Sequence, residues 1–484
     1  MNSASRQAID AERWPRVARI PEGRFLAKRA EMMERSFERL CQDNGIELVE
    51  SGEFVGESFI TRSTGDADLA IDGVGGVSSS GGSESPTGSE SLRPVVFSVI
   101  DPVFYSRLAD SEWLGLGEAF LAGEWSSDDL PELLSRLLSA EFDIASLGPL
   151  ARGLMKVARS RPRLDGPDMA GELPTSLLEL YSGELLMGGS GLFASGVRTS
   201  SREQIPNYAR GAGKGGVPSH WSVDVTYVDA PKSVARADFL HAQVRNIEHM
   251  LDLARVRAGD RVAEWPSAGG EIALRAAERG AGAEVITVSD DHTDTVLERV
   301  EKAGLRGAVD VIQMDRNIPS PREFESDFEA VINVGRLETF GRAGALRWLK
   351  SAERLLVDRG TIVVQMVVAT DKFDALAERS LDLVRAYVWP QLQLFTMEEL
   401  RKMVDRETGL RIAAEEYIPA HFATTLQLQR DFFAAHAREA AGIGYDRVFR
   451  RMWNYYLSLF EALVRAEKVT LVQVELVHAP RRPH

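Results

Sequence analysis

The stretch that decides the fold runs from Asp327 to Gly341 and reads D-F-E-A-V-I-N-V-G-R-L-E-T-F-G. Its apolar run predicts a buried strand that ends at Gly335. One carboxylate, that of Glu338, follows just past the carboxyl end of this strand. In open α/β sheets, ligands bind outside the carboxyl ends of the strands. We therefore expect Glu338 to lie at a site of binding or chemistry.

The chain from residue 238 onward alternates strand-like and helix-like patterns around this segment. Predicted strands cover 261–265, 284–288, 309–314, 329–334, 361–368 and 470–477. Predicted helices cover 241–253, 271–278, 293–303, 343–356, 372–387, 397–408, 424–439 and 447–467. This order predicts the α/β class, with a doubly wound sheet of the Rossmann type.

Composition and charge exclude several classes of function. The net charge of −15 over 484 residues argues against nucleic acid as a partner, because phosphate binding needs a positive surface. A single cysteine, Cys41, excludes a disulfide framework and a thiolate metal cluster. The eight histidines show no metal-binding spacing, so we expect no metal site.

The chain contains no apolar run near the ~18 residues of a membrane span and no signal-peptide core at its start. We therefore expect a cytoplasmic protein. Five cations between Arg152 and Arg163 are compatible with peripheral contact at the inner membrane face, and the alternative is a solvated helix face.

Composition also divides the chain. Residues 61–92 are rich in glycine and serine and predict a disordered insertion after an N-terminal segment, residues 1–60. We expect an N-terminal module at 93–150, a connector rich in Pro, Gly and Arg at 151–218, and the Rossmann domain at 219–484.

Three motifs carry a resemblance to a known family. They are the 327–341 stretch, the pair D-P-V-F-Y (101–105) and G-L-G-E-A-F-L-A-G-E-W (115–125), and Y-D-R-V-F-R-R-M-W-N-Y-Y-L (445–457). The chain resembles cyclopropane-fatty-acyl-phospholipid synthases and mycolic acid methyltransferases, as a divergent member. This resemblance implies a class I methyltransferase-like fold with a seven-stranded sheet and a smaller N-terminal α+β module. It also implies methyl or methylene transfer from S-adenosylmethionine to unsaturated acyl chains of phospholipids.

The resemblance places a cofactor loop after the first strand of the Rossmann domain. Where the family has a glycine-rich loop, this chain keeps Glu264, Gly269 and Gly270, and Pro266 replaces the first glycine. Glycine lets a backbone approach a ligand closely, so we name these three retained residues as cofactor-binding candidates. A glycine pair also serves a plain strand-to-helix turn.

A second cofactor element follows the next strand. Thr287, Ser289 and Asp290 match the family's T-L-S motif and the residue after it, where side chains reach the ribose and adenine. The alternative is that Ser289 caps the following helix and that the aspartates favour its dipole.

The family's base is a bicarbonate held by Cys, Glu, His and Tyr side chains. Of these positions Glu338 is retained, whereas Ser267 replaces the cysteine, Gln365 the histidine and Phe422 the tyrosine. Ser267 and Gln365 can still form hydrogen bonds, so with Glu338 they are the catalytic candidates. Most of the bicarbonate site is nevertheless substituted, and Glu338 alone could cap the next helix.

Two interpretations follow. The chain is either an active lipid methyltransferase with a reshaped pocket, or a catalytically impaired relative that serves as a lipid-binding or partner subunit. The family segment that closes over the cofactor has no counterpart near residues 219–224, so we expect this lid to be lost or rebuilt. Assembly as a homo- or hetero-oligomer is left open.

Overall fold

The structure is a computed structural model. It describes residues 9–50, 94–140 and 172–480, apart from 24, 187, 188, 195, 268, 325 and 326. The Gly/Ser-rich stretch at 61–92 and the basic cluster from Arg152 to Arg163 lie outside these residues. The domain boundaries stay a prediction.

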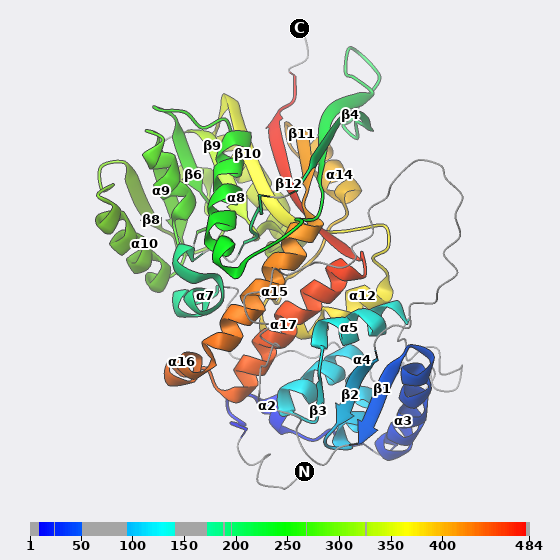
Figure 1. Ribbon diagram of the computed structural model, residues 1–484. Helices are drawn as coiled ribbons and strands as arrows, with labels where there is room; N and C mark the ends of the chain where they lie inside the picture. Colours follow the sequence, from blue (N-terminus) through cyan, green and yellow to red (C-terminus); the bar gives the residue numbers. More distant parts are fainter. Residues whose placement is uncertain are drawn as a thin grey trace.

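A nine-stranded sheet forms the centre of the larger part of the molecule (Figure 1). Its order is β4-β5-β11-β12-β10-β9-β6-β7-β8. Strands β10, β9, β6, β7 and β8 pair in parallel, whereas β12 pairs antiparallel with both β10 and β11. The strands are β4 (Arg198–Pro206), β5 (His220–Val228), β6 (Arg261–Glu264), β7 (Gly282–Thr287), β8 (Val309–Gln313), β9 (Phe328–Val334), β10 (Leu356–Ala369), β11 (Leu410–Tyr417) and β12 (Val469–His478).

Helices cover both faces of the central strands, which explains why these strands read as continuous apolar runs. One face carries α8 (Phe239–Leu253), α9 (Glu271–Glu278) and α10 (Asp290–Ala303). The other face carries α11 (Gly341–Leu355) and α14 (Met397–Glu407). This is the doubly wound α/β class that the sequence predicts, and the fold class is confirmed.

The N-terminal part is a smaller α+β module around a three-stranded sheet of order β1-β2-β3. A stacked pair, Phe97 and Trp125, and the edge-on ring of Phe37 lie in its core. Its elements are α2 (Pro15–Ala18), α3 (Leu26–Asp43), β1 (Ile46–Glu50), β2 (Val95–Val99), α4 (Val103–Ala122), β3 (Trp125–Ser127) and α5 (Leu130–Ser139).

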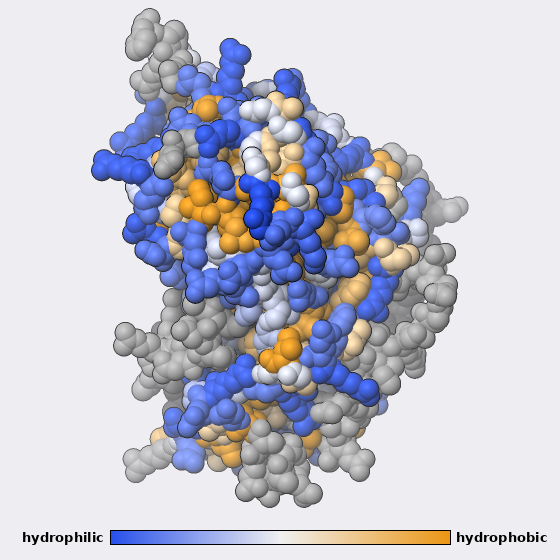
Figure 2. Space-filling model, turned by 90° about the vertical axis from the view of Figure 1, so that its left-hand side faces the viewer, coloured by the Kyte–Doolittle hydropathy of each residue, from blue (hydrophilic) through white to orange (hydrophobic). Residues whose placement is uncertain are grey.

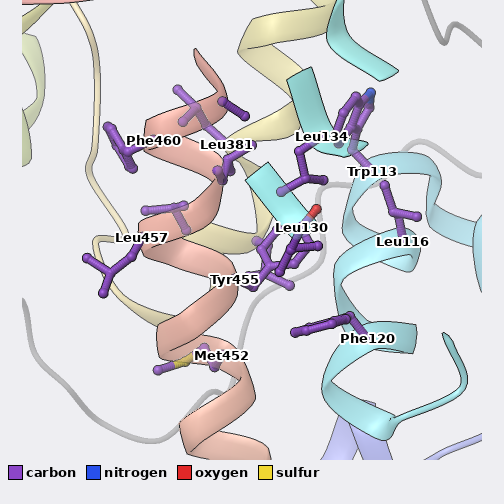
Figure 3. Close-up of a cluster of buried hydrophobic side chains, with 14 of the residues drawn as sticks. Trp113, Leu116, Phe120, Leu130, Leu134, Leu381, Met452, Tyr455, Leu457 and Phe460 are labelled. Carbon is purple, nitrogen blue, oxygen red and sulfur yellow. The ribbon is translucent and has the colours of Figure 1, made fainter. Parts of the chain in front are cut away.

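Two long helices near the C-terminus connect the module to the large sheet. Figure 3 shows side chains of α4 and α5 directed toward α17, with Phe120 beside Tyr455. The two parts therefore share one continuous apolar core. The remaining helices are α7 (Thr175–Ser182), α12 (Ala375–Ser380), α13 (Asp382–Tyr387), α15 (Pro419–Ala435), α16 (Ala437–Gly442) and α17 (Arg447–Arg465), with 3-10 turns η3 (Gly183–Leu185), η4 (Arg236–Asp238), η5 (Pro321–Glu323) and η6 (Leu337–Phe340).

Some details differ from the sequence-based expectation. The sheet has nine strands rather than seven, because the hairpin β4–β5 extends it beyond β11. Strand β4 is polar and almost fully exposed, so it lacks the apolar alternation that identifies a strand. Strand β11 is likewise absent from the prediction, and the helices expected at 372–387 and 424–439 are each divided in two.

The side of the molecule that carries α10 and α16 is mostly hydrophilic, with smaller hydrophobic patches between the polar residues (Figure 2). Two of the exposed apolar side chains in this region belong to Leu297 of α10 and Ile443, which follows α16. Among the described helices, none combines the length and the apolar character needed to cross a bilayer.

The shared core predicts that the module and the sheet domain unfold together. Replacing Phe120 with alanine should destabilise the protein by about 3–5 kcal/mol, because it opens a cavity between α4 and α17. Urea unfolding followed by circular dichroism and by tryptophan fluorescence should then give one coincident transition, shifted to lower urea. The matched control is Leu240→Ala, whose side chain is exposed. Two separate transitions, with only one shifted, would contradict the shared core.

Candidate functional site

One large cavity opens at the carboxyl ends of β6, β9 and β10, where the sequence analysis expects a site. Its empty volume is about 1220 Å³, which includes space open to solvent. Six of the nine predicted site residues line it, namely Glu264, Ser267, Gly269, Gly270, Glu338 and Gln365. The fold thus gathers residues from three strand ends around one space.

Glu338 lies in η6, directly after the strand that places it, and its side chain is buried. Its Oε1 accepts a hydrogen bond of 3.0 Å from the backbone N–H of Val367 in β10. Its Oε2 is buried and has no hydrogen-bond partner among the described residues. Burial raises the pKa of Glu338 to about 7, although the hydrogen bond from Val367 acts in the opposite direction.

This contact decides one alternative left open by the sequence. The carboxylate of Glu338 accepts from strand β10 and not from the N-terminus of α11, where the N-cap residue is Phe340 and shows no side-chain cap. The interpretation of Glu338 as a helix cap is therefore wrong. A buried carboxylate with one free oxygen on a cavity wall is a group that can bind or take a proton from a ligand.

Glu264 and Ser267 stabilise the turn between β6 and α9. The Ser267 hydroxyl donates to Oε1 of Glu264 at 2.5 Å and accepts from the N–H of Gly270 at 2.9 Å. Oε2 of Glu264 accepts from the N–H of Ala273 at 2.9 Å. Burial raises the pKa of Glu264 to about 6, partly offset by these hydrogen bonds. Both side chains border the cavity while they hold the loop in shape.

The two glycines of this loop are needed because other side chains pack on them. A Cβ atom at Gly269 would lie 2.7 Å from Cβ of Leu186, and one at Gly270 would lie 2.8 Å from Val296. Gly270 also has a φ of +68°, which favours glycine. Their backbones still line the cavity, so the loop presents main-chain atoms to whatever the cavity holds.

Gln365 belongs to a buried network of three side-chain amides below the cavity. Its Oε1 accepts from Nδ2 of Asn246 at 2.9 Å and from Nε2 of Gln473 at 2.8 Å. Gln473 also donates to Oδ1 of Asn246 at 2.7 Å. Because both acceptor sites of Oε1 are used, Gln365 can offer the cavity only the N–H donors of its amide nitrogen.

The second predicted cofactor element lies beside the cavity. Thr287 is buried, and its hydroxyl forms a hydrogen bond of 2.6 Å with the hydroxyl of Thr293. Ser289 caps α10, because its side chain accepts from the N–H of His292. Asp290 is exposed and accepts from Gln313. The capping role proposed as the alternative for Ser289 is therefore confirmed. None of Thr287, Ser289 and Asp290 is among the described residues that line the cavity.

The connector supplies the roof of the cavity, which the sequence analysis did not expect. The roof segment, residues 172–193, contains α7 and η3 and contributes Glu172, Leu178 and Tyr181 to the lining. The expectation that the family's lid is lost or rebuilt stays a prediction. The apolar run of T-S-L-L-E-L-Y (175–181) was the signal that could have revealed the roof segment.

The start of the roof segment is attached to the edge of the sheet. Glu172 forms two ion-pair contacts with Arg336, at 2.6 and 2.8 Å. Thr175 donates from its backbone N–H and its hydroxyl to the two carboxylate oxygens of Asp291, at 2.8 and 2.7 Å. The carbonyl of Leu173 accepts from the His292 ring at 2.8 Å. These contacts close the cavity on the side of α10.

The end of the roof segment is attached to α15. Nδ1 of His421 accepts from the N–H of Phe193 at 2.9 Å, and its Nε2 donates to the carbonyl of Asp229 at 3.0 Å. Burial lowers the pKa of His421 to about 4, so this ring stays neutral at physiological pH. Next to it, Thr425 accepts from the N–H of Gly191 at 2.9 Å.

His292 is a site residue that the sequence analysis missed. Because Nε2 faces the carbonyl of Leu173, it carries the hydrogen, and Nδ1 is left as an acceptor. Nδ1 is buried, lies 3.8 Å from Oε2 of Glu172 and has no hydrogen-bond partner among the described residues, and His292 lines the cavity. Buried polar atoms are almost always satisfied in folded proteins, so this atom and Oε2 of Glu338 indicate a polar ligand.

A second group of lining residues is apolar or aromatic, and we call the part of the cavity that it lines the apolar end. Its walls come from α15, α17 and the turn after α13, and include Phe422 at the position where the family has a tyrosine. The apolar and aromatic lining residues at this end are Trp389, Leu392, Phe422, Leu426, Tyr456, Leu457, Phe460 and Leu471. An apolar space of this kind suits a hydrocarbon chain.

Comparisons with known proteins agree with this description. The family model described as mycolic acid cyclopropane synthetase matches residues 224–474, which is more than half of the chain. The tuberculostearic acid methyltransferase UfaA1 of Mycobacterium tuberculosis is 24% identical over 470 residues, covering 97% of this chain and 96% of the relative.

Two solved structures align with large parts of this chain. A coclaurine N-methyltransferase bound to N-methylheliamine and SAH matches with a TM-score of 0.50 at 12% identity, over 75% of this chain and 97% of that one. The cyclopropane synthase MmaA2 of Mycobacterium tuberculosis matches with a TM-score of 0.48 at 15% identity, over 63% of this chain and 94% of that one.

The tight packing at the loop predicts a cost for any side chain at residue 269. Gly269→Ala should destabilise the protein by about 1–3 kcal/mol, because the new Cβ would meet Leu186 and displace the roof segment. The matched control is Gly307→Ala, where no atom lies near the added Cβ. Urea unfolding of both variants measures the difference, and equal stabilities would contradict the packing of Leu186 on this loop.

The raised pKa of Glu338 predicts a pH dependence of stability. Between pH 4.5, its ordinary pKa, and about 7, the folded state keeps a proton that the unfolded state releases. The free energy of unfolding therefore falls as pH rises through this window. Glu338→Gln removes this titration, so its unfolding free energy should fall less over the window, by an amount on the order of 1–3 kcal/mol. Denaturant curves measured at several pH values test this, with exposed Glu278→Gln as control. An unchanged pH profile in Glu338→Gln would refute the assignment.

Proposed function

We propose that this chain, which belongs to the mycolic acid cyclopropane synthetase family, uses S-adenosylmethionine to add a methyl or methylene group to an unsaturated acyl chain of a phospholipid. The observation that carries the proposal is a pair of buried polar atoms on residues of one cavity, Nδ1 of His292 and Oε2 of Glu338, that form no hydrogen bond among the described residues. Together they indicate a polar ligand next to an apolar space, as a transfer between a polar cofactor and a lipid requires.

The charge of the cavity favours a cationic ligand. Four glutamates line it, namely Glu172, Glu264, Glu271 and Glu338. Two of them are paired with arginines, Glu172 with Arg336 and Glu271 with Arg275 and Arg299, whereas Glu264 and Glu338 have no ion pair within 4.0 Å among the described residues. S-adenosylmethionine carries a positive sulfonium, which an acidic cavity attracts. When bound, it supplies the methyl group of the reaction.

The residues at the polar end fit such a cofactor. We assign cofactor binding to the loop of Glu264, Gly269 and Gly270, whose backbone faces the cavity, and to the Nδ1 acceptor of His292. Thr287, Ser289 and Asp290 support this region from the second strand and helix, with Ser289 fixing the start of α10. Glu338, Ser267 and Gln365 form the group nearest to the chemistry in this proposal.

The apolar end gives the proposal its lipid substrate. Leucine and aromatic side chains of α15 and α17 exclude water there, which protects a reactive hydrocarbon cation from hydrolysis. The similarity to a tuberculostearic acid methyltransferase supports an acyl chain as the acceptor. The lipid lies in a membrane, so the proposal includes peripheral contact with the inner membrane face from a cytoplasmic location. A homo- or hetero-oligomer is compatible with it.

A second candidate function is a lipid-binding or partner subunit without catalysis. It is favoured because residues of the roof segment contact positions that a cofactor would otherwise bind. Thr175 donates to both carboxylate oxygens of Asp291, and Leu186 packs on Gly269. Pro266 at the first glycine position supports the same interpretation. In this case the cavity would bind an acyl chain and no cofactor.

Two titrations and one assay separate the two candidates. Calorimetric titration with S-adenosylmethionine and with S-adenosylhomocysteine should show micromolar binding if the first candidate holds. Incubation with S-adenosylmethionine and vesicles of dioleoylphosphatidylglycerol should then yield a lipid of higher mass. Lipid binding without cofactor binding would favour the second candidate instead.

A larger side chain at the apolar end should impair the lipid reaction without impairing the binding of S-adenosylmethionine. Leu457→Trp should reduce lipid turnover by more than about tenfold, because the larger ring occupies the space of the acyl chain, while binding of S-adenosylmethionine stays unchanged. The control is Leu240→Trp at an exposed position on α8. Unchanged turnover in Leu457→Trp, measured by mass spectrometry of the lipid, would exclude this end as the acyl site.

A further inference from the structure

We propose that the carboxylate of Glu338 itself accepts the proton released in the reaction, so that this chain works without a bound bicarbonate. The inference rests on the proposed function and concerns the same cavity. It follows from what the substituted positions around Glu338 now do, from the charge of the cavity, and from the free oxygen of the carboxylate.

Two of the substituted positions offer nothing to an additional anion. The hydroxyl of Ser267 already donates to Glu264 at 2.5 Å, so its single hydrogen is used within the loop. Phe422 lines the cavity with a ring that has no hydrogen-bonding group. The residues at these two positions therefore do not hold a bicarbonate, and no step is assigned to one.

Gln365 cannot compensate for these losses. Its Oε1 is held by Asn246 and Gln473, so only its neutral amide N–H groups are available to the cavity. A neutral donor provides a hydrogen bond without a positive charge. Two negative groups side by side in a buried site need such a charge, because each raises the cost of ionising the other.

The cation closest to this role is engaged elsewhere. Arg336 lines the cavity, but its guanidinium pairs with Glu172 of the roof segment through two contacts of 2.6 and 2.8 Å. Of the other lining glutamates, Glu271 pairs with Arg275 and Arg299, and burial raises the pKa of Glu264 to about 6. These arginines are thus engaged with carboxylates, and an inorganic anion beside Glu338 would lie next to a second negative group, so the electrostatic cost opposes its binding.

The geometry of Glu338 suits a base that acts directly. One oxygen is fixed by the N–H of Val367, which holds the group in place, and the other is buried with no hydrogen-bond partner among the described residues, on a residue that lines the cavity. Efficient general bases have a pKa near the working pH. Burial raises the pKa of Glu338 to about 7, which agrees with this requirement.

The π electrons of the alkene form a bond to the transferred methyl carbon while the carbon–sulfur bond breaks, and its electron pair stays on sulfur. The cation left on the acyl chain loses a proton to Oε2 of Glu338, and the C–H electron pair closes a ring or forms a double bond. Glu338 becomes a neutral carboxylic acid and returns the proton to solvent after product release.

The test compares methyl transfer with and without bicarbonate. The full chain, S-adenosylmethionine and dioleoylphosphatidylglycerol vesicles are incubated in CO₂-free buffer, with either sodium bicarbonate or an equal concentration of sodium chloride. We expect equal rates in both, and a kcat that rises with pH to a plateau above about 7. A rate that depends on bicarbonate would overturn the inference. No product in either buffer would overturn the proposed function, and the inference with it.

Variants test the role of the carboxylate itself. Glu338→Gln should lower kcat by about 10²–10⁴-fold, with the binding of S-adenosylmethionine retained in calorimetry as evidence of an intact fold. Its residual rate should lose the pH dependence of the wild type. The matched control is Glu475→Gln, a buried carboxylate on β12 outside the cavity lining, which should keep the wild-type rate and profile. A Glu338→Gln variant with wild-type turnover would overturn the inference.

Discussion

The parallel pairing of β9 with β10 is the interaction on which the site depends. It aligns Gln365 with Val334, and the carbonyl of Gln365 accepts from the N–H of Gly335 at 2.7 Å, where β9 ends. The chain then turns through η6 and returns the carboxylate of Glu338 to the N–H of Val367, two residues further along β10. A shift of register by one residue would turn Gln365 toward the opposite face and separate the two side chains.

The second constraint is the burial of charge at this edge. Burying a carboxylate costs desolvation free energy, and each buried glutamate at this edge has different partners that offset this cost. Glu264 is satisfied by Ser267 and by the N–H of Ala273, and Glu172 is satisfied by Arg336. Only Glu338 keeps a free oxygen, so among these groups it is the one whose charge state a ligand would change.

The roof segment and the shared core explain how a divergent chain keeps an enclosed cavity. The roof is attached at one end to the α10 edge and at the other to α15. Helix α17 contributes one side of its surface to the cavity and another to the core that it shares with α4 and α5. The N-terminal module is therefore part of the support of the apolar end of the cavity and not an independent attachment.

The sequence by itself determined the alternation of strands and helices in the Rossmann core, the place of Glu338 after a buried strand, and the glycine turn before α9. These features depend on local patterns, because apolar periodicity and glycine report directly on burial and backbone conformation. The family membership was readable for the same reason, from motifs with short spacing.

Only the tertiary structure decided which of the candidates meet. It brought Glu338 and Gln365 to one cavity, left Asp290 exposed, and added His292 and the roof segment, which come from distant parts of the chain. Strand β4 and the roof segment were not predicted, because a polar strand and a short apolar run are stabilised by the elements they contact and not by a local pattern. Hydrogen-bond satisfaction is likewise a property of the folded chain, so the free oxygen of Glu338 could not be read from the sequence.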